Sequence, residues 1–144
     1  MDLTSVILDT NIFVAAGFRP GSDAGRILEL VRSEKLSMIW HEQTLEEIRH
    51  IINKIPPLAR SWSGTAPLFS PERSYPWPLS IEDFHHIPDP ADRKFAALAA
   101  ATGGTLISLD ADLLTTRHLA FPLILRPHEF WQRWGQEDQD RGEA

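Results

Sequence analysis

Four acidic residues that lie far apart in the chain stand beside apolar segments, where they could form one site. They are Asp9, Glu47, Asp92 and Asp110. Two carboxylates about 4 Å apart repel each other by on the order of 1 kcal/mol in water and about 4 kcal/mol at an effective dielectric constant of 20. A carboxylate cluster therefore takes up protons or binds a cation. If the fold brings these residues together, the sequence predicts a cation-binding site.

The available donor atoms restrict the kind of cation. The chain contains no cysteine, which excludes disulfides, thiolate nucleophiles, iron–sulfur clusters and thiolate zinc sites. The histidines show no spacing typical of zinc ligands; they are His41, His50, His85, His86, His118 and His128. Carboxylate oxygens favour Mg²⁺ or Mn²⁺, and Mg²⁺ completes its coordination shell with water and substrate phosphate. We therefore expect Mg²⁺ or Mn²⁺ as the cofactor.

The first 40 residues predict a strand, a helix and a second strand. Residues 4–8 are apolar and rich in β-branched side chains, which favours a buried strand with Asp9 as its last residue. After the loop "GFRPGSD", apolar residues between 27 and 31 have helical spacing, and residues 36–40 favour another buried strand. In a parallel sheet, ligands gather at the carboxyl ends of the strands. We therefore expect the Asp9 side chain at the open edge of the sheet.

The middle of the chain contains one helix and a long proline-rich segment. Apolar residues at every third or fourth position between 45 and 55 indicate an amphipathic helix, which Pro56 and Pro57 end. Eight of the eleven prolines lie between residues 56 and 90, so regular elements cannot be long there. We expect residues 56–88 to form a partly ordered loop with one or two short helical turns.

The C-terminal part returns to alternating helices and strands. Asp89 can cap an alanine-rich helix, Pro90 can occupy its first position, and Gly103 can end it. Residues 105–109 and the segment "FPLILRP" are strand candidates. Leu113 and Leu114 suggest a short helix, and a further helix is expected around residues 130–134.

This alternation predicts a single α/β domain over residues 1–135. The expected architecture has three layers, α/β/α, with a central, mostly parallel sheet and helices on both faces. Residues 136–144 are polar, and we expect a frayed tail there. The composition, with 42% hydrophobic and 24% charged residues, is ordinary for a folded domain.

Each aspartate also has a purely structural interpretation. Asp9 could cap a turn through local backbone bonds. Asp89 and Asp92 could both serve the start of the alanine-rich helix, because negative charge there complements the helix dipole. Asp110 and Asp112 could each cap the short helix that follows, and we assign the cap to Asp112.

Two adjacent glutamates lie on different faces of the predicted helix. Glu46 points away from the apolar stripe, beside Arg49 and His50, and we expect it to be solvated and paired three or four residues later. Glu47 lies at the margin of the stripe beside Ile51, where it could lean over the edge of the sheet. The alternative for Glu47 is an ordinary glutamate at the boundary between the apolar and polar faces of the helix.

Charge and hydropathy exclude some functional classes. The net charge of −6 argues against the broad basic surface typical of proteins that bind duplex DNA, and it agrees with a cluster of carboxylates. No apolar run approaches the length of a membrane span, and the first residues lack the basic segment of a signal peptide. We therefore expect a cytoplasmic protein without a membrane partner.

Four segments, taken in this order and at these separations, resemble the PIN-domain ribonucleases, which include VapC-type toxins of toxin–antitoxin pairs. The segments are "VILDTNIFV", "TLEEI", "DPADRKFAALAAATGGTLISLDADLL" and "LILRPHEFW". The resemblance covers most of the chain apart from residues 56–88 and the tail. It places the acidic positions of the family on the four carboxylates named above, and it places neighbouring polar positions on Asn11, Ser108 and Asp112.

The resemblance implies an Mg²⁺- or Mn²⁺-dependent endonuclease that cleaves single-stranded or structured RNA and leaves 5′-phosphate and 3′-hydroxyl ends. It also implies a homodimer and a small antitoxin protein as a partner. In this interpretation the three aspartates of the cluster hold the metal, and Glu47 completes the cluster, directly or through water, and orients the attacking water. Asn11 and Ser108 are expected to hold the aspartates by hydrogen bonds, with Asp112 as an accessory acidic residue.

The contacts that this chain would make with RNA are less defined. Residues 56–88 depart from the family, in which this region is more helical, so they predict neither substrate choice nor dimer geometry. Trp62 and Trp77 lie in this segment and are candidates for stacking on bases. The candidates for phosphate contacts are Arg19, Arg93 and Arg117.

Two other functions remain open at this point. Haloacid-dehalogenase phosphatases also begin with a strand followed by aspartate, but they carry a second aspartate two residues later, where this chain has Asn11. A PIN fold could also serve as a catalytically silent module that binds RNA or protein. Product formation that depends on Mg²⁺ would distinguish an enzyme from such a module.

Overall fold

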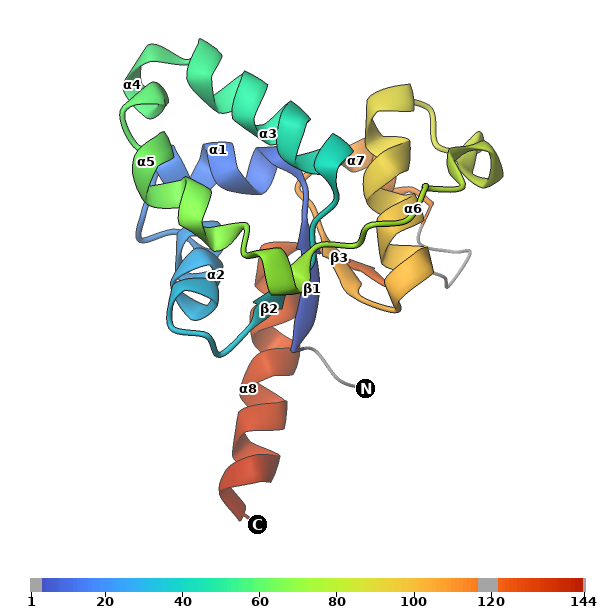
Figure 1. The fold of residues 1–144 in the computed structure, drawn as a ribbon. Helices are drawn as coiled ribbons and strands as arrows, with labels where there is room; N and C mark the ends of the chain where they lie inside the picture. Colours follow the sequence, from blue (N-terminus) through green and yellow to red (C-terminus); the bar gives the residue numbers. More distant parts are fainter. Residues whose placement is uncertain (1–3, 117–121, 144) are drawn as a thin grey trace.

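A parallel β-sheet forms the centre of the molecule (Figure 1). The computed structural model describes residues 4–116 and 122–143, with side chains up to residue 135. Within these residues the strands are β1 (Ser5–Leu8), β2 (Ser37–Met38), β3 (Thr105–Ile107) and β4 (Ile124–Leu125), in the order β2-β1-β3-β4. Val6 is in register with Met38 on one side and with Thr105 on the other, and each neighbouring pair is parallel. The expected parallel sheet is therefore confirmed.

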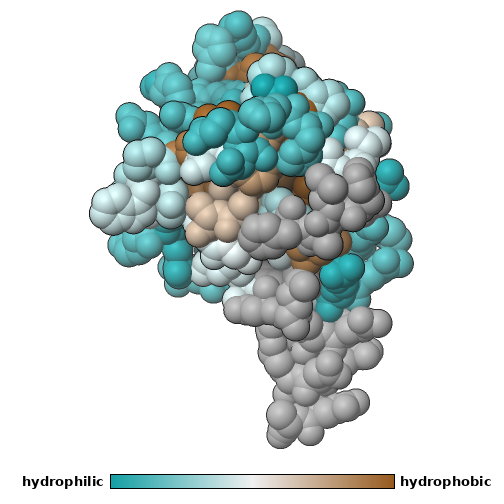
Figure 2. All heavy atoms as spheres, turned by 90° about the vertical axis from the view of Figure 1, so that its right-hand side faces the viewer, coloured by the Kyte–Doolittle hydropathy of each residue, from teal (hydrophilic) through white to brown (hydrophobic). Residues whose placement is uncertain are grey.

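Helices cover both faces of the sheet. On one side in Figure 1 lie α1 (Thr10–Phe18), α2 (Asp23–Arg32) and α3 (Glu42–Lys54), and on the other lies α6 (Arg93–Thr102). Ile7, Ile12 and Phe95 are among the fully buried core side chains. The three-layer α/β/α architecture is thus confirmed. Figure 2 shows that the α6 side presents mostly hydrophilic side chains, with smaller hydrophobic areas between them. No helix of the described residues has an apolar stretch long enough to cross a lipid bilayer.

Helix α1 was not predicted from the sequence. Residues 10–18 are apolar almost throughout, so their hydrophobicity has no helical period that would reveal the helix. The helix packs against both α2 and α3, which explains why so much of its surface is apolar. We expected Asp9 to be the last residue of the first strand. Because β1 ends at Leu8 and α1 begins at Thr10, Asp9 is instead the single residue between them.

Helix α3 follows the predicted amphipathic pattern. Ile48 and Ile52 are buried, and the helix ends before Pro56. At its start, Nδ1 of His41 accepts a hydrogen bond from the backbone N–H of Gln43 at 3.0 Å. His41 therefore caps a helix.

The proline-rich segment consists of short turns held by aromatic side chains. The turns are α4 (Pro56–Ala59), α5 (Trp62–Thr65), η1 (Ala66–Leu68), η2 (Pro71–Arg73) and η3 (Ile81–Phe84). The ring of Phe69 lies 5.7 Å from that of Phe13, 5.9 Å from Trp40 and 6.0 Å from Trp62. A parallel bridge also joins Trp40 to Ser74. The segment is thus more ordered than expected, although its elements are short, as its prolines require.

The second half of the chain supplies the elements around β3 and β4. They are η4 (Pro90–Asp92), which leads into α6, then α7 (Ala111–Leu114) and α8 (Pro127–Glu143). Gly103 ends α6 with a left-handed φ of 75°, as expected. In place of the frayed tail expected from Gln136, α8 continues to Glu143. No proline interrupts this stretch, and extending an existing helix costs little free energy.

Candidate active site

One open pocket, of about 210 Å³, lies at the carboxyl ends of β1 and β3 and is lined by the four predicted carboxylates. They reach it from the end of β1 (Asp9), from α3 (Glu47), from the start of α6 (Asp92) and from the turn after β3 (Asp110). The other lining residues are Thr10, Asn11, Ile51, Asp89, Ala91 and Phe95. The structure therefore brings these carboxylates together at the sheet edge where ligands of parallel α/β folds collect.

Asp9 is buried, with 3% of its surface exposed. It occupies the N-cap position of α1 but makes no regular capping hydrogen bond there, although the backbone N–H groups of Ile12 and Asn11 are close enough to lower its pKa. Its Oδ2 accepts a hydrogen bond from the hydroxyl of Ser108, and its Oδ1 is buried without a hydrogen-bond partner. A buried carboxylate oxygen without a partner is costly unless the group is protonated or binds a cation.

Ser108 connects the two strand ends. Its buried hydroxyl donates to Asp9 Oδ2 and accepts a hydrogen bond from the backbone N–H of Asp110 at 2.9 Å. The contact expected of Ser108 is therefore present. Asn11, for which the same contact is expected, is exposed and lines the pocket, but among the described residues its side chain makes no hydrogen bond to these aspartates.

Asp110 caps the short helix α7. Its Oδ1 accepts a hydrogen bond from the backbone N–H of Asp112 at 2.8 Å, whereas the sequence analysis assigned the cap to Asp112. That prediction is wrong because α7 begins at Ala111, which places Asp110 at the N-cap position and Asp112 in the first turn. The Asp112 side chain is consequently free of a capping role and is exposed.

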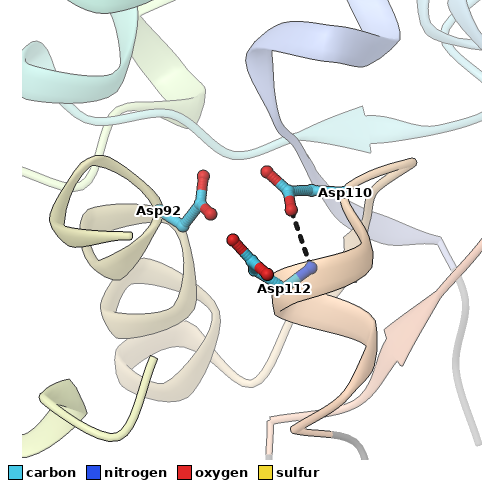
Figure 3. Close-up of side chains that lie close together, drawn as sticks. All are labelled: Asp92, Asp110 and Asp112. Carbon is cyan, nitrogen blue, oxygen red and sulfur yellow. Dashed lines mark hydrogen bonds between the residues drawn. The ribbon is translucent and has the colours of Figure 1, made fainter. Parts of the chain in front are cut away.

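Asp92, Asp110 and Asp112 form a close group of carboxylates (Figure 3). One oxygen from each side chain lies within 4.8 Å of the others. Oδ2 of Asp92 is buried and has no hydrogen-bond partner. We expected the group to contain Asp9 in place of Asp112; Asp9 instead lines the same pocket outside this group. Spacing in the sequence could not distinguish the two, because the direction of Asp112 depends on where α7 begins.

Burial and repulsion raise the pKa of two of these aspartates. Burial raises the pKa of Asp9 to about 7; the charge of Asp110 adds to the rise, and the hydrogen bond from Ser108 opposes it. The pKa of Asp92 also rises to about 7, first through burial and then through the charge of Asp110 and a hydrogen bond with it. Both groups are therefore close to their titration points at neutral pH, and a cation in the pocket would favour their charged forms.

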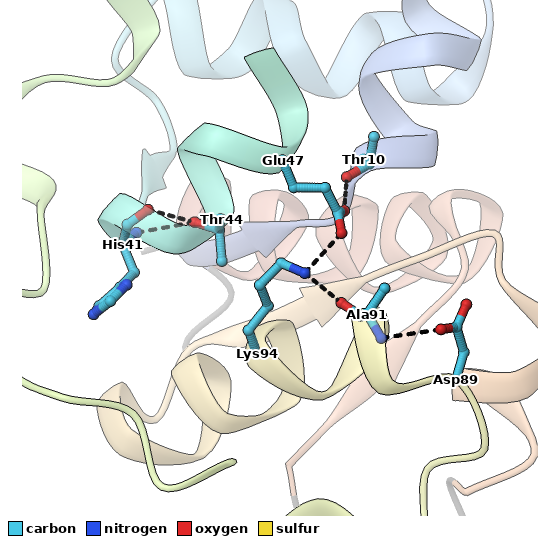
Figure 4. A network of polar contacts seen from close by, with 7 residues as sticks. All are labelled: Thr10, His41, Thr44, Glu47, Asp89, Ala91 and Lys94. Atoms are coloured by element: carbon cyan, nitrogen blue, oxygen red, sulfur yellow. Dashed lines mark hydrogen bonds and ion pairs between the residues drawn. The ribbon is translucent and has the colours of Figure 1, made fainter. Parts of the chain in front are cut away.

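Glu47 differs from these aspartates because both of its carboxylate oxygens have partners (Figure 4). The Thr10 hydroxyl donates to Oε2, and Nζ of Lys94 donates to Oε1 at 2.7 Å. Lys94 also donates to the backbone carbonyl of Ala91 at 2.7 Å. Thr10 and Lys94 were not predicted as parts of the site. The available signal for Lys94 was its place two residues after Asp92, in the first turn of α6.

Several other candidate residues lie away from this pocket. Glu46 pairs with Arg49 at 2.6 Å on the exposed face of α3, as expected. Arg93 donates from Nε to the backbone carbonyl of Ile87 at 3.0 Å, which turns it toward the loop before α6. Arg19 follows the C-terminal end of α1, about 13.5 Å along the helix axis from Thr10 at a rise of 1.5 Å per residue.

The tryptophans and the histidines that the structure describes do not line the pocket. Trp62 packs against Phe69, whereas Trp77 is 65% exposed. No histidine of the described part of the chain belongs to a group that could hold a metal ion. Arg117 and His118 lie outside the described residues.

Comparison with protein families identifies the chain over most of its length. The family described as PIN domain matches residues 5–117, which include all the carboxylates of the pocket. The uncharacterized protein MJ1680 of Methanocaldococcus jannaschii is 26% identical over 124 residues. That match covers 78% of this chain and 74% of the relative.

Solved structures share the fold at low sequence identity. VapBC2 from Rickettsia felis, bound to a DNA fragment from their promoter, has a TM-score of 0.55 and 20% identity, covering 84% of this chain and 96% of that chain. FitAcB from Neisseria gonorrhoeae has a TM-score of 0.58 and 17% identity, covering 85% and 97%. FitAB bound to the IR36 DNA fragment has a TM-score of 0.57 and 18% identity, covering 85% and 94%. With the family match across the sheet, the helices and the acidic pocket, this chain belongs to the PIN-domain family.

Proposed function

We propose that this protein is a divalent-metal-dependent endoribonuclease that hydrolyses phosphodiester bonds of RNA, with Mg²⁺ or Mn²⁺ as its cofactor. The observation that carries the proposal is a pair of buried carboxylate oxygens without partners, Asp9 Oδ1 and Asp92 Oδ2, in one acidic pocket. Buried polar atoms are almost always hydrogen-bonded in folded proteins, so these two favour a missing ligand that is positively charged.

The donor set fits a hard divalent cation. Opposite ligands of Mg²⁺ are about 4.2 Å apart, since each bond is about 2.1 Å long. The oxygens of Asp92, Asp110 and Asp112 lie within 4.8 Å of one another, so a small rotation of the exposed Asp112 side chain would bring the three together on one ion. Mg²⁺ commonly takes few protein carboxylates and keeps the remaining positions for water and substrate phosphate.

In this function the residues of the chain have distinct tasks. Asp92, Asp110 and Asp112 bind the cation. When bound, the ion stabilises charge on a phosphate and lowers the pKa of a water molecule. Ser108 holds Asp9 through its hydroxyl and holds the turn of Asp110 through the backbone N–H, which keeps both carboxylates in place as substrate binds.

Similarity to the PIN-domain family and to solved toxin–antitoxin complexes supports RNA as the substrate and an antitoxin as a partner. Membership of the PIN-domain family argues against the phosphatase alternative, and the acidic pocket favours an enzyme over a catalytically silent module. The residues that line the pocket include no arginine or lysine, and the neighbouring Lys94 is paired with Glu47, so the bound cation would be the main attraction for a phosphate there. The shared fold with VapBC2 and FitAB supports a homodimer that acts as the toxin of a toxin–antitoxin pair, with a small antitoxin protein as partner.

The test is incubation of the purified protein with total RNA in the presence of Mg²⁺ or EDTA. We expect Mg²⁺-dependent cleavage by the wild type and its loss in Asp9→Asn and Asp110→Asn. Asparagine remains a good N-cap residue, so Asp110→Asn keeps the start of α7. Glu46→Gln is the matched control, because it removes an exposed carboxylate from α3 outside the pocket. Full activity of either aspartate variant, or equal activity in EDTA, would contradict the proposal.

A further inference from the structure

The pocket holds two kinds of carboxylate. Glu47 has a partner on each oxygen, with Thr10 on Oε2 and Lys94 on Oε1 at 2.7 Å (Figure 4). Asp9 and Asp92 each have a buried oxygen without any partner. Only the second kind is prepared for an added ligand, because a ligand of Glu47 would have to displace an existing bond.

Lys94 is held firmly where it meets Glu47. Its side chain is only 15% exposed, and its ammonium group also donates to the carbonyl of Ala91 at 2.7 Å. The same group lies 5.4 Å from the ring centre of Phe95. The neighbouring cation, Arg93, is bonded to loop carbonyls and does not compete for Glu47.

The ion pair links two separate elements, since Glu47 comes from α3 and Lys94 from α6. Recruiting Glu47 to a metal ion would leave the ammonium group partly buried without its counter-charge, which is unfavourable. A second cation beside the ammonium group would also be repelled by it. Both effects restrict a divalent ion to the other side of the pocket.

We propose that Lys94 serves as a built-in cation for Glu47, so that Glu47 is not a metal ligand and the pocket holds a single divalent ion near Asp92, Asp110 and Asp112. The inference rests on the metal site of the proposed function and corrects the expectation that Glu47 completes the metal cluster. Glu47 and Lys94 are then positioning residues that join α3 to α6 beside the site.

Mn²⁺ binding, measured by calorimetry and by electron paramagnetic resonance on the full chain, tests this inference without RNA. The wild type is expected to bind one Mn²⁺ per chain. Glu47→Gln should change the affinity by less than about 3-fold, whereas Asp110→Asn should weaken it by at least about 10-fold, the range seen for disturbed metal sites.

Variants of Lys94 test whether its charge excludes a second ion. Lys94→Met is expected to release Glu47 and raise the stoichiometry to two Mn²⁺ per chain, and Lys94→Arg, which keeps the charge, should stay at one. Circular dichroism and thermal unfolding identify any variant that fails to fold, and Glu47→Gln then carries the test alone.

Three results would overturn the inference: two Mn²⁺ bound to the wild type, an affinity loss in Glu47→Gln as large as in Asp110→Asn, or a folded Lys94→Met that still binds one ion. A parallel cleavage assay separates it from the proposed function. One bound Mn²⁺ without RNA cleavage would contradict the proposed ribonuclease function but not the inference about Lys94. Two bound ions with RNA cleavage would contradict the inference but not the function. No Mn²⁺ binding by the wild type would contradict both proposals.

Discussion

Glu47 and Asp92 line the same pocket, but their carboxylates have different surroundings. On the α3 side, Glu47 is neutralised by Lys94 and bonded by Thr10. On the α6 side, Asp92 faces Asp110, and none of the ion pairs seen in the described residues involves either aspartate. Burial and this like charge raise the pKa of Asp92 to about 7.

The difference shows where a ligand can contribute most free energy. A carboxylate with internal partners gains little from an added cation, since the cation must replace contacts that already exist. A carboxylate that is buried beside like charges gains much, because the cation removes both repulsion and desolvation cost. The side of the pocket around Glu47, whose carboxylate already has partners (the satisfied side), therefore supports the structure. The side around Asp92, whose carboxylate has a buried oxygen without a partner (the unsatisfied side), is the binding site.

The largest effect is expected from removing a charge on the unsatisfied side. Asp110→Asn should lower Mg²⁺-dependent RNA cleavage by at least about 100-fold, equivalent to about 2.7 kcal/mol of transition-state stabilisation. The metal-free variant should unfold at the same or a higher temperature, because the substitution relieves repulsion on Asp9 and Asp92. Initial cleavage rates and thermal melts measure both, and a less stable variant without loss of activity would contradict the comparison.

The stability of the metal-free protein should depend on pH through Asp9 and Asp92. Their pKa rises from 3.8 to about 7 on folding, so between these values the folded state binds more protons than the unfolded chain. Their contribution to stability is therefore fully present below about pH 4 and is lost as the pH rises through 7.

Mg²⁺ should restore the stability that the protein loses as the pH rises. At about 100 times its dissociation constant, a ligand stabilises a protein by about 2.7 kcal/mol, or about 5–10 °C for a domain of this size. We expect an increase of this order in melting temperature at pH 8 and little change at pH 5, where protons occupy the same groups. Differential scanning calorimetry measures it, with Asp92→Asn as the variant that should lose the part of the pH dependence that comes from Asp92 and keep the part that comes from Asp9. An equal Mg²⁺ effect at both pH values would contradict this prediction.

Ser108→Ala should have a smaller effect, because it disturbs the position of the aspartates without removing a charge. Asp9 loses the largest of the hydrogen bonds that lower its pKa, and the backbone N–H of Asp110 loses its acceptor. We expect about a 10-fold loss of cleavage and a shift of the activity profile toward higher pH. Ser61→Ala, which removes a hydroxyl bonded to a backbone carbonyl outside the pocket, should leave the profile unchanged.

The smallest effect is expected from removing the ion pair between Lys94 and Glu47, and it concerns the free energy of unfolding. Lys94→Met removes a partly buried ion pair and should lower the free energy of unfolding by about 1–2 kcal/mol. Arg49→Met removes an ion pair of similar length, 2.6 Å against 2.7 Å, from the exposed face of α3. It should lower the free energy of unfolding by less than about 0.5 kcal/mol. Urea denaturation compares the two variants, and equal losses would show that burial does not distinguish the pairs.

The sequence was most informative where local patterns are independent of their neighbours. The amphipathic stripe of α3, the proline that ends it, and Gly103 at the end of α6 were all predicted, since each depends on local backbone chemistry. Helix α1 was missed because packing on several sides removes the polar face that reveals a helix. The cap of α7 was assigned to Asp112 instead of Asp110 because a shift of two residues in the start of the helix exchanges their roles.

From residue types alone, the absence of cysteine and the presence of aspartates after apolar strands already indicated a hard-cation pocket at the carboxyl edge of a parallel sheet. Which carboxylates would remain unsatisfied in that pocket was not visible in the chain. Lys94 meets Glu47 across 47 positions of sequence, and Ser108 meets Asp9 across 99. Such pairings depend on how α6 packs against α3 and how β3 lies beside β1, and those arrangements arise only when the whole core forms.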